Sequence, residues 1–178
     1  MSLPPVTHEP SVALRRVNES DGPFLFQVYA STRQEELAHV GWGESQKHSF
    51  LEMQFQAQRR YYEAEYPGAE FQIILAGGHP VGRLYVHRRE NEIRIMDLAL
   101  LPPSRRQGIG TRLLKAILDE GGRSNRRVTI HVEVFNPALQ LYERLGFRRV
   151  TINGVYHLLQ WLPAESQVNP EPTHSKNQ

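Results

Sequence analysis

The stretch LALLPPSRRQGIGT, Leu98–Thr111, decides the fold of this chain. An apolar run passes through two prolines into the turn Arg105–Gly110, and an amphipathic helix is predicted to begin directly after it. The first N–H groups of such a helix have no partner within it, and they face the turn together with the positive end of the helix dipole. Gly108 and Gly110 would let the backbone approach an anion closely, and the two arginines of the turn would add charge-assisted contacts. The turn therefore predicts a phosphate site, although two glycines can equally make a mere tight strand-to-helix connection.

Two common phosphate-binding loops do not match this turn. It lacks the Gly-Lys-Ser/Thr ending of an ATPase loop, and it lacks the third glycine and the distant acid of a dinucleotide-binding fingerprint. A different mode of phosphate binding is required.

The elements on either side of the turn predict a mixed α/β fold of the α+β kind. Short turns join the apolar runs 71–76, 81–87 and 92–100, so these three strands are expected to be antiparallel, whereas a helix between two strands implies a parallel crossover. We expect a mostly antiparallel central sheet of about six strands, helices on both faces, and the order β-α-α-β-β-β-α-β-α-β. The predicted strands are 12–17, 71–76, 81–87, 92–100, 128–134 and 151–162, and the predicted helices follow residue 21, span 45–66, surround 113–118 and follow residue 137.

Two glycine signals are predicted to end helices in the second half of the chain. Gly121-Gly122 is expected to stop the helix that follows the phosphate turn. Asn136-Pro137 supplies a capping residue and a proline for the start of the next helix, and Gly146 stands where a left-handed C-terminal cap is expected.

Length and composition bound the class of protein. With 178 residues and 39% hydrophobic content, the chain can bury one sizeable core, so we predict a single domain over residues 1–163 and a disordered tail over 164–178. No apolar run approaches the roughly 20 residues of a membrane span, and the start lacks the pattern of an export signal. We therefore expect a soluble, cytoplasmic protein that does not associate with a membrane.

Charged and metal-binding residues narrow the ligand classes. Eighteen of the 21 basic residues are arginine, whose planar fork suits phosphate and carboxylate groups. These arginines are spread along the chain and aromatic content is only 9%, so nucleic acid is not expected as a partner. The chain has no cysteine, which excludes thiolate chemistry, and its eight histidines form no close cluster, so no metal is predicted.

The turn and a second segment together resemble a known family. Leu98–Thr111 is similar to the pyrophosphate-binding motif of the GCN5-related N-acetyltransferases, in which Gln or Arg, two residues, Gly, one residue, and Gly or Ala recur. The segment 136–147, NPALQLYERLGF, resembles the family's second hallmark and follows at the expected distance. The resemblance implies acetyl-coenzyme A as cosubstrate. It implies that the pantetheine arm pairs with the backbone of Leu98, Ala99 and Leu100, that Arg105, Arg106, Gln107, Gly108, Ile109, Gly110 and Thr111 surround the pyrophosphate, and that Asn136 contacts the arm.

Acetyl transfer to an amine needs a base for the amine and an acid for the departing thiolate. The resemblance implies that Tyr142 is the acid, whereas its helical periodicity alone favours core packing. Glu133 and Asp97 are both candidates for the base, the alternatives being a solvated strand face for Glu133 and an ion-paired structural carboxylate for Asp97. His131 could relay protons. Trp42 and Glu44 could line the acceptor pocket, or their segment could equally be a plain link between the two front helices.

We therefore predict an acyltransferase, an N-acetyltransferase that moves an acetyl group from acetyl-CoA to a primary amine by direct attack in a ternary complex. The acceptor is an amine on a small molecule or a protein, and a homodimer is allowed. The alternative is a non-catalytic acyl-CoA-binding sensor or interaction module.

Overall fold

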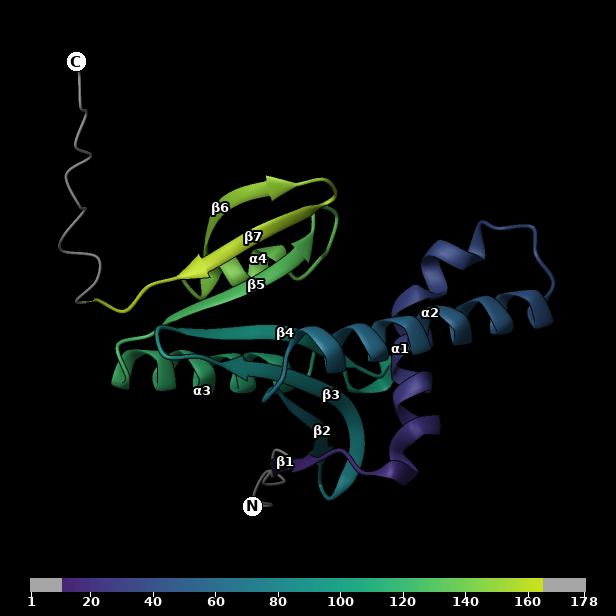
Figure 1. The fold of residues 1–178 in the computed structure, drawn as a ribbon, viewed down its shortest axis with the longest axis horizontal. Helices are drawn as coiled ribbons and strands as arrows, with labels where there is room; N and C mark the ends of the chain where they lie inside the picture. The colour runs from purple at the N-terminus through teal and green to yellow at the C-terminus, as the bar shows by residue number, and fades with distance from the viewer. Residues whose placement is uncertain (1–10, 165–178) are drawn as a thin grey trace, which may run out of the picture. The chain divides into compact units, whose positions relative to one another are not determined.

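A computed structural model describes residues 11–164 of the chain, and its elements follow the predicted order (Figure 1). The strands are β1 (Val12–Arg16), β2 (Glu70–Ala76), β3 (His79–Arg88), β4 (Glu92–Leu100), β5 (Arg127–Glu133), β6 (Arg148–Asn153) and β7 (Tyr156–Trp161). The helices are α1 (Gly22–Ala38), α2 (Glu44–Glu65), α3 (Ile109–Arg123) and α4 (Leu139–Arg144), and two 3-10 turns are η1 (Glu19–Asp21) and η2 (Pro102–Ser104). The tail predicted from residue 164 onward lies, after that residue, outside the described part.

The sheet is mixed and mostly antiparallel, as predicted. Its hydrogen-bonded strand order is β1-β2-β3-β4-β5-β7-β6, and β4 pairs with β5 in parallel after the crossover through α3. It has seven strands, because the single last strand predicted over 151–162 was wrong. Gly154 and Val155 form the turn between β6 and β7, and Gly154 has a φ of +60°, so the segment forms an antiparallel hairpin.

The described residues form two compact units, 11–86 with 97–110, and 87–96 with 111–164. The single-domain prediction is not tested by this division and stays a prediction. No helix within residues 11–164 is both long and apolar enough to span a bilayer.

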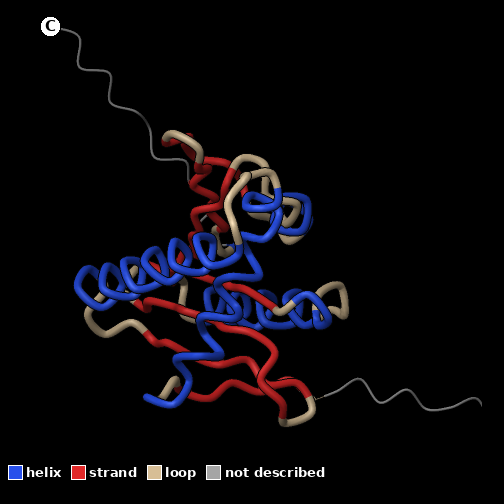
Figure 2. The backbone as a smooth tube through the Cα atoms, turned by 90° about the vertical axis from the view of Figure 1, so that its right-hand side faces the viewer, coloured by secondary structure: helices blue, strands red, loops and turns tan. Residues whose placement is uncertain are grey.

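Aromatic side chains hold α1 and α2 together in the first unit. Figure 2 shows the backbone of the helices in blue and that of the strands in red. The Phe55 ring of α2 lies 5.7 Å from the rings of Phe26 and Tyr29 on α1, and the Tyr29 hydroxyl donates to Gln54 at 3.1 Å. In the adjoining strands, the register pairs Phe71 with Tyr85. The Tyr85 ring contacts Tyr62 of α2 at 6.0 Å, so this face of β2 and β3 carries the helices. Side chains on the opposite face are buried as well: Ile74, Leu84 and Val86.

Gly82 sets how closely β3 approaches the end of β4. A Cβ atom at this position would collide with the carbonyl oxygen of Ala99 and would lie 2.8 Å from the Leu100 side chain. The register of β2 with β3 also shifts beside this residue, between Ile74 and Leu75. Only glycine fits there, and it brings the last residues of β4 against β3.

The Trp161 ring of β7 packs closely against glycines in the second unit. A Cβ atom at Gly121 would lie 3.2 Å from the Trp161 ring and 2.9 Å from Val128 of β5. The expectation that Gly121-Gly122 ends α3 was therefore wrong: the helix continues to Arg123, and glycine serves close packing rather than termination.

The predicted cap of α4 is confirmed. Gly146 has a φ of +94°, its N–H donates to the Glu143 carbonyl at 3.0 Å, and the Phe147 N–H donates to the Tyr142 carbonyl at 3.0 Å. These are the two hydrogen bonds of a Schellman motif. The helix itself begins later than predicted, at Leu139, because residues 137 and 138 form a turn.

Glu120 of α3 should be a main electrostatic support of the second unit. It accepts from Arg88 Nη2 and from Arg126 Nη2 at 2.8 Å each, and the Arg88 hydrogen bond is the chief reason why its pKa is lowered. We expect Glu120→Gln to lower the free energy of unfolding by about 1–2 kcal/mol at pH 7 in urea titrations.

Because the folded-state pKa of Glu120 is lowered, its contribution is complete above the ordinary pKa near 4.3 and is lost as the pH falls further. The deficit of the variant should therefore shrink below about pH 4. Glu143→Gln breaks the exposed pair with Arg149 and serves as the control, with a cost under about 0.5 kcal/mol. Equal costs for the two variants would contradict this assignment.

Candidate functional site

The turn between β4 and α3 has the backbone of an anion-binding loop. After β4 ends at Leu100, the chain makes η2 and then the turn, and α3 begins at Ile109. Arg106 has a φ of +59° and Gly108 a φ of +78°, so two residues of the turn adopt the left-handed conformation. A non-glycine residue seldom adopts this conformation, because it strains the backbone. Strained residues of this kind are frequent at functional sites.

The two glycines of the turn leave the backbone open. A Cβ atom built at Gly108 or at Gly110 would meet no atom within 4 Å. Neither glycine is therefore needed for packing against the protein, in contrast to Gly82 and Gly121. The space above this backbone, next to the first N–H groups of α3, fits a phosphate group.

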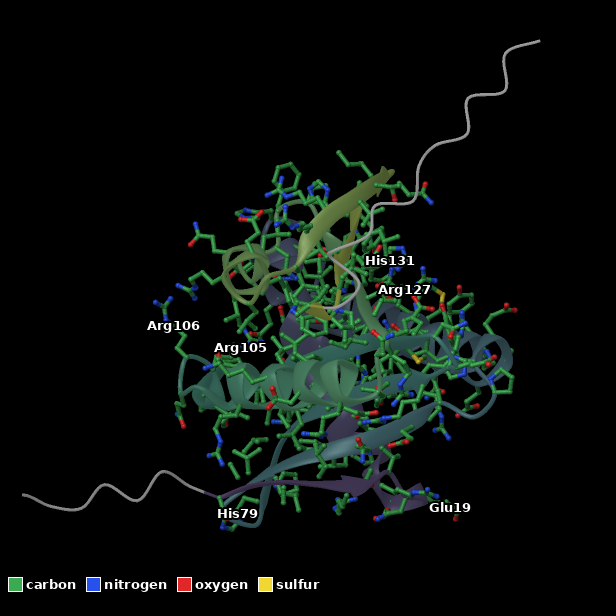
Figure 3. The ribbon with its side chains drawn as sticks, turned by 90° about the vertical axis from the view of Figure 1, so that its left-hand side faces the viewer. Glu19, His79, Arg105, Arg106, Arg127 and His131 are labelled. Atoms are coloured by element: carbon green, nitrogen blue, oxygen red, sulfur yellow. The ribbon has the colours of Figure 1, made fainter. Side chains whose placement is uncertain are left out.

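The side chains of the turn divide between protein and solvent. Arg105 donates from Nε to the Leu100 carbonyl at 2.8 Å and from Nη2 to Ser31 Oγ at 3.2 Å, so it ties the turn to β4 and to α1. Gln107 donates to the Pro103 carbonyl at 2.7 Å. Arg106 is exposed and extends away from the ribbon (Figure 3). Of the two arginines predicted to contact an anion, Arg106 is the one directed outward.

The end of β4 lies directly before this turn. Ala99 is buried, and Leu98 and Leu100 are half-buried. The Leu101 N–H donates to the Val81 carbonyl at 2.9 Å, which fixes the end of the strand to β3 beside Gly82. Both the strand predicted to carry the pantetheine arm and the turn predicted to carry the pyrophosphate are thus anchored in the first unit.

Asp97 is held in a buried ion pair. Its Oδ2 accepts from Arg83 Nη2 at 2.7 Å, and the Arg83 side chain is 2% exposed. Arg83 also donates to Gln58 at 3.0 Å. This is the structural-carboxylate arrangement that the sequence analysis gave as the alternative to catalysis.

The other predicted catalytic residues lie in the second unit. Tyr142 of α4 is 6% exposed, and its ring packs edge-on to Phe147 at 5.6 Å. Glu133 is the last residue of β5 and is half-buried, with the Tyr156 hydroxyl at 3.5 Å from Oε1. Asn136 accepts through Oδ1 from the Ala138 N–H at 2.8 Å, and it thereby shapes the turn that leads into α4.

His131 and Arg127 are exposed residues on one face of β5 (Figure 3). Its Nδ1 accepts from Arg94, which sets the tautomer with the proton on Nε2. Desolvation and the Arg94 charge lower the pKa of His131, so the ring is neutral at pH 7. Within residues 11–164, no three histidine or acidic side chains gather as a metal site would require.

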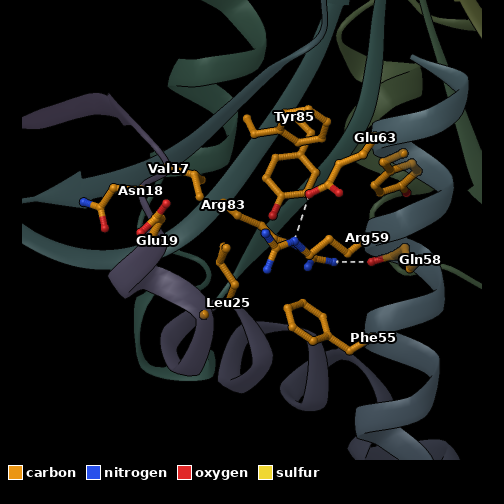
Figure 4. A pocket seen from close by; sticks show the side chains of 13 residues that line it. Val17, Asn18, Glu19, Leu25, Phe55, Gln58, Arg59, Glu63, Arg83 and Tyr85 are labelled. Atoms are coloured by element: carbon orange, nitrogen blue, oxygen red, sulfur yellow. Dashed lines mark hydrogen bonds and ion pairs between the residues drawn. The ribbon is translucent and has the colours of Figure 1, made fainter. Parts of the chain in front are cut away.

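A cavity in the first unit was missed by the sequence analysis. Its volume is about 170 Å³, and its walls come from the start of α1, from α2 and from β2 and β3. Arg83 lines it (Figure 4). Trp42, which we expected to border the acceptor, packs on Phe50 with ring centroids 5.1 Å apart, and its place beside an acceptor stays a prediction. The sequence did contain a feature that could have pointed to this region. Arg83 and Asp97 each interrupt an apolar strand, and opposite charges on neighbouring strands can form an ion pair.

The sequence model of the acetyltransferase (GNAT) family matches residues 31–147, well over half of the chain. This chain belongs to the GNAT acetyltransferase family. No curated protein sequence matches it.

Solved GNAT structures share the fold. A PaiA N-acetyltransferase from Thermoplasma acidophilum, in complex with coenzyme A, is 16% identical with a TM-score of 0.65 over 85% of this chain and 99% of that one. Naa50 from Arabidopsis thaliana, in complex with a bisubstrate analogue CoA-Ac-MVNAL, is 19% identical with a TM-score of 0.54 over 85% and 98%. The ribosomal L7/L12 alpha-N-protein acetyltransferase RimL is 20% identical with a TM-score of 0.58 over 89% and 92%.

Filling the space above Gly110 should separate ligand binding from folding. Gly110→Val places a branched side chain over the open backbone, while valine is no worse than glycine within a helix. We expect the affinity for coenzyme A, measured by isothermal titration calorimetry, to fall at least tenfold, with the melting temperature unchanged within about 2 °C. Gly41→Val, at a glycine with equally open surroundings, is the control that should retain affinity. Unchanged coenzyme A affinity in Gly110→Val would remove the turn from the binding site.

Adding one methyl group at Gly82 should lower the stability of the fold, unlike the substitution at Gly110. Gly82→Ala forces a Cβ atom against the Ala99 carbonyl, so β4 or β3 must shift. We expect a loss of about 2 kcal/mol or more in the free energy of unfolding, measured by urea denaturation. A fully stable Gly82→Ala protein would show that the close approach of β3 and β4 is not required.

Proposed function

We propose that this GNAT protein is an N-acetyltransferase that moves the acetyl group of acetyl-CoA to a primary amine within a ternary complex. The observation that carries the proposal is the turn of residues 105–110, whose two glycines leave the backbone open beside the N-terminus of α3. Membership of the family supports the acetyltransferase chemistry, and the bound coenzyme A of the PaiA neighbour supports the choice of cosubstrate.

The proposed cosubstrate site uses the backbone more than side chains. Gln107–Thr111 would surround the pyrophosphate, and the exposed guanidinium of Arg106 would neutralise part of its charge. The backbone of Leu98–Leu100 would pair with the pantetheine arm as an added strand, and Asn136 would contact the arm. Arg105 would chiefly position the turn, because its guanidinium already donates to the Leu100 carbonyl and to Ser31 Oγ.

Bound acetyl-CoA supplies an activated thioester, and the chain must supply proton transfer. We propose Tyr142 as the acid that protonates the departing thiolate. For the base, Glu133 is the better candidate. Asp97 is already occupied by the buried guanidinium of Arg83, and a proton bound there would weaken a buried ion pair.

The proposed acceptor is a primary amine of a protein or peptide. Two structural neighbours support this class by what their names state: Naa50 holds a CoA analogue joined to the peptide MVNAL, and RimL acts on the α-amino group of a ribosomal protein. A small-molecule amine is the alternative within the same reaction. We also propose that the reaction takes place in the cytoplasm.

Turnover tests the proposal. Purified protein should release free coenzyme A from acetyl-CoA when given an amine panel of N-terminal peptides, a lysine peptide and small polyamines, and the product should gain the mass of one acetyl group. Tight binding of acetyl-CoA with no turnover on any acceptor would favour a non-catalytic acyl-CoA-binding module.

Three substitutions then separate the proposed proton-transfer roles. Tyr142→Phe should lower kcat about 10²-fold or more with little change in acetyl-CoA affinity, because the ring still packs against Phe147. Glu133→Gln should lower kcat by a similar factor, because the amide cannot accept the proton of the amine. Asp97→Asn should lower stability by leaving Arg83 buried without its counter-charge, with a smaller effect on kcat in the folded fraction. An unchanged rate in Tyr142→Phe would remove this residue as the acid.

A further inference from the structure

Ser31 is a buried serine of α1 whose hydroxyl group contacts the turn between β4 and α3. The hydroxyl donates to the Val28 carbonyl at 2.7 Å, and its oxygen accepts from Arg105 Nη2 at 3.2 Å. A hydroxyl group has one hydrogen to donate, so the bond to Val28 leaves the oxygen free to act only as an acceptor. A guanidinium group needs such a partner, because it carries five donor hydrogens and no acceptor.

The contact with Ser31 gives the turn a support that lies in another helix. Arg105 Nε donates to the Leu100 carbonyl at 2.8 Å, and these two residues are five positions apart in the sequence. Arg105 Nη2 reaches both the hydroxyl and the carbonyl oxygen of Ser31, which is 74 positions away. The side chain of Arg105 thus fastens the turn to the end of β4 and to the body of α1.

The turn needs this support because its backbone is strained next to Arg105. Arg106 has a φ of +59°, a conformation that a non-glycine residue keeps only where the surrounding structure holds it. On the other side of Arg106, the Gln107 side chain donates to the Pro103 carbonyl at 2.7 Å. Both neighbours of the strained residue are therefore held by their side chains. The N–H groups that follow keep the direction that an anion beside the N-terminus of α3 requires.

We propose that Ser31 is a positioning residue for the cosubstrate: it holds Arg105, and Arg105 holds the turn in the conformation that binds the pyrophosphate. The inference rests on the proposed function, because it takes this turn as the coenzyme A site. When a protein adopts its binding conformation for only a fraction of the time, its measured affinity falls by that fraction. The Ser31 hydroxyl would thus raise the affinity for coenzyme A without touching the ligand.

Thr32 provides a matched control on the same helix. Its hydroxyl donates to the Tyr29 carbonyl at 2.7 Å, so Ser31→Ala and Thr32→Ala each remove a hydroxyl bonded to the carbonyl three residues earlier. Ser31 differs in that it also accepts from Arg105. By isothermal titration calorimetry, Ser31→Ala should weaken coenzyme A binding about fivefold, whereas Thr32→Ala should stay within about twofold of the parent chain. The melting temperature of each variant should change by less than about 3 °C.

A double-mutant cycle tests whether Ser31 acts through Arg105. Arg105→Met removes the guanidinium group, and it should weaken coenzyme A binding at least about tenfold. In that background, Ser31→Ala should cause less than about a twofold further loss, because the partner of the hydroxyl is already absent. A general effect of Ser31→Ala on the fold would instead weaken coenzyme A binding by the same factor in both backgrounds.

The possible results separate this inference from the proposed function. No binding of coenzyme A by the parent chain would refute the cosubstrate site, and the role of Ser31 with it. Binding by the parent chain together with an undiminished affinity in Ser31→Ala, or with additive losses in the cycle, would overturn the role of Ser31 alone. If circular dichroism shows that Arg105→Met does not fold, the comparison of Ser31→Ala with Thr32→Ala decides, and equal affinities of these two variants would overturn the inference.

Discussion

The buried ion pair between Arg83 and Asp97 is the constraint on which the first unit depends. Moving a guanidinium and a carboxylate out of water costs several kcal/mol for each ion, and only close pairing offsets this. Arg83 is also enclosed by the Tyr29 and Tyr85 rings and bonded to Gln58, so β3, β4, α1 and α2 must all be in place for its charge to be tolerated. Gly82, the preceding residue, lets β3 approach β4 closely enough for the pair to form.

This constraint connects the fold to the proposed chemistry. Asp97 immediately precedes Leu98–Leu100, so the pair that satisfies Arg83 also holds in position the strand that is proposed to carry the pantetheine arm. The turn that follows has a different character. Its glycines face open space, and its side chains either fasten it to β4 and α1 or extend into solvent. A rigid strand next to an open loop is the arrangement that a ligand-binding site on a stable scaffold requires.

The sequence allowed much of the fold to be predicted, because its signals there were local. Three short segments each predict a local conformation without reference to the rest of the chain: the apolar strand 92–100, the glycine at position 146 and the turn 105–110. The signals that depend on distant partners were misread. Gly121 resembled a helix stop, yet it is a packing glycine because Trp161 lies against it, forty residues later. Gly154 was a local turn signal that was overlooked within an apolar run.

The residues of the candidate site also differ in how far the sequence could predict them. The residues of the turn were predicted from their own pattern and from family resemblance, and their roles toward acetyl-CoA remain a proposal. The cavity lined by Arg83 depends on contacts between α1, α2, β2 and β3, which no local sequence pattern encodes, although the charges at positions 83 and 97 each interrupt an apolar strand.

We propose that the turn at residues 105–110 binds the pyrophosphate of coenzyme A. The most direct measurement compares coenzyme A with pantetheine, which has the thiol arm without the pyrophosphate and adenosine, by isothermal titration calorimetry. Including 4′-phosphopantetheine separates the phosphate from the nucleoside. If the turn holds the pyrophosphate, pantetheine should bind at least 100-fold more weakly than coenzyme A, and 4′-phosphopantetheine should recover part of the lost affinity. Equal affinities for pantetheine and coenzyme A would contradict it.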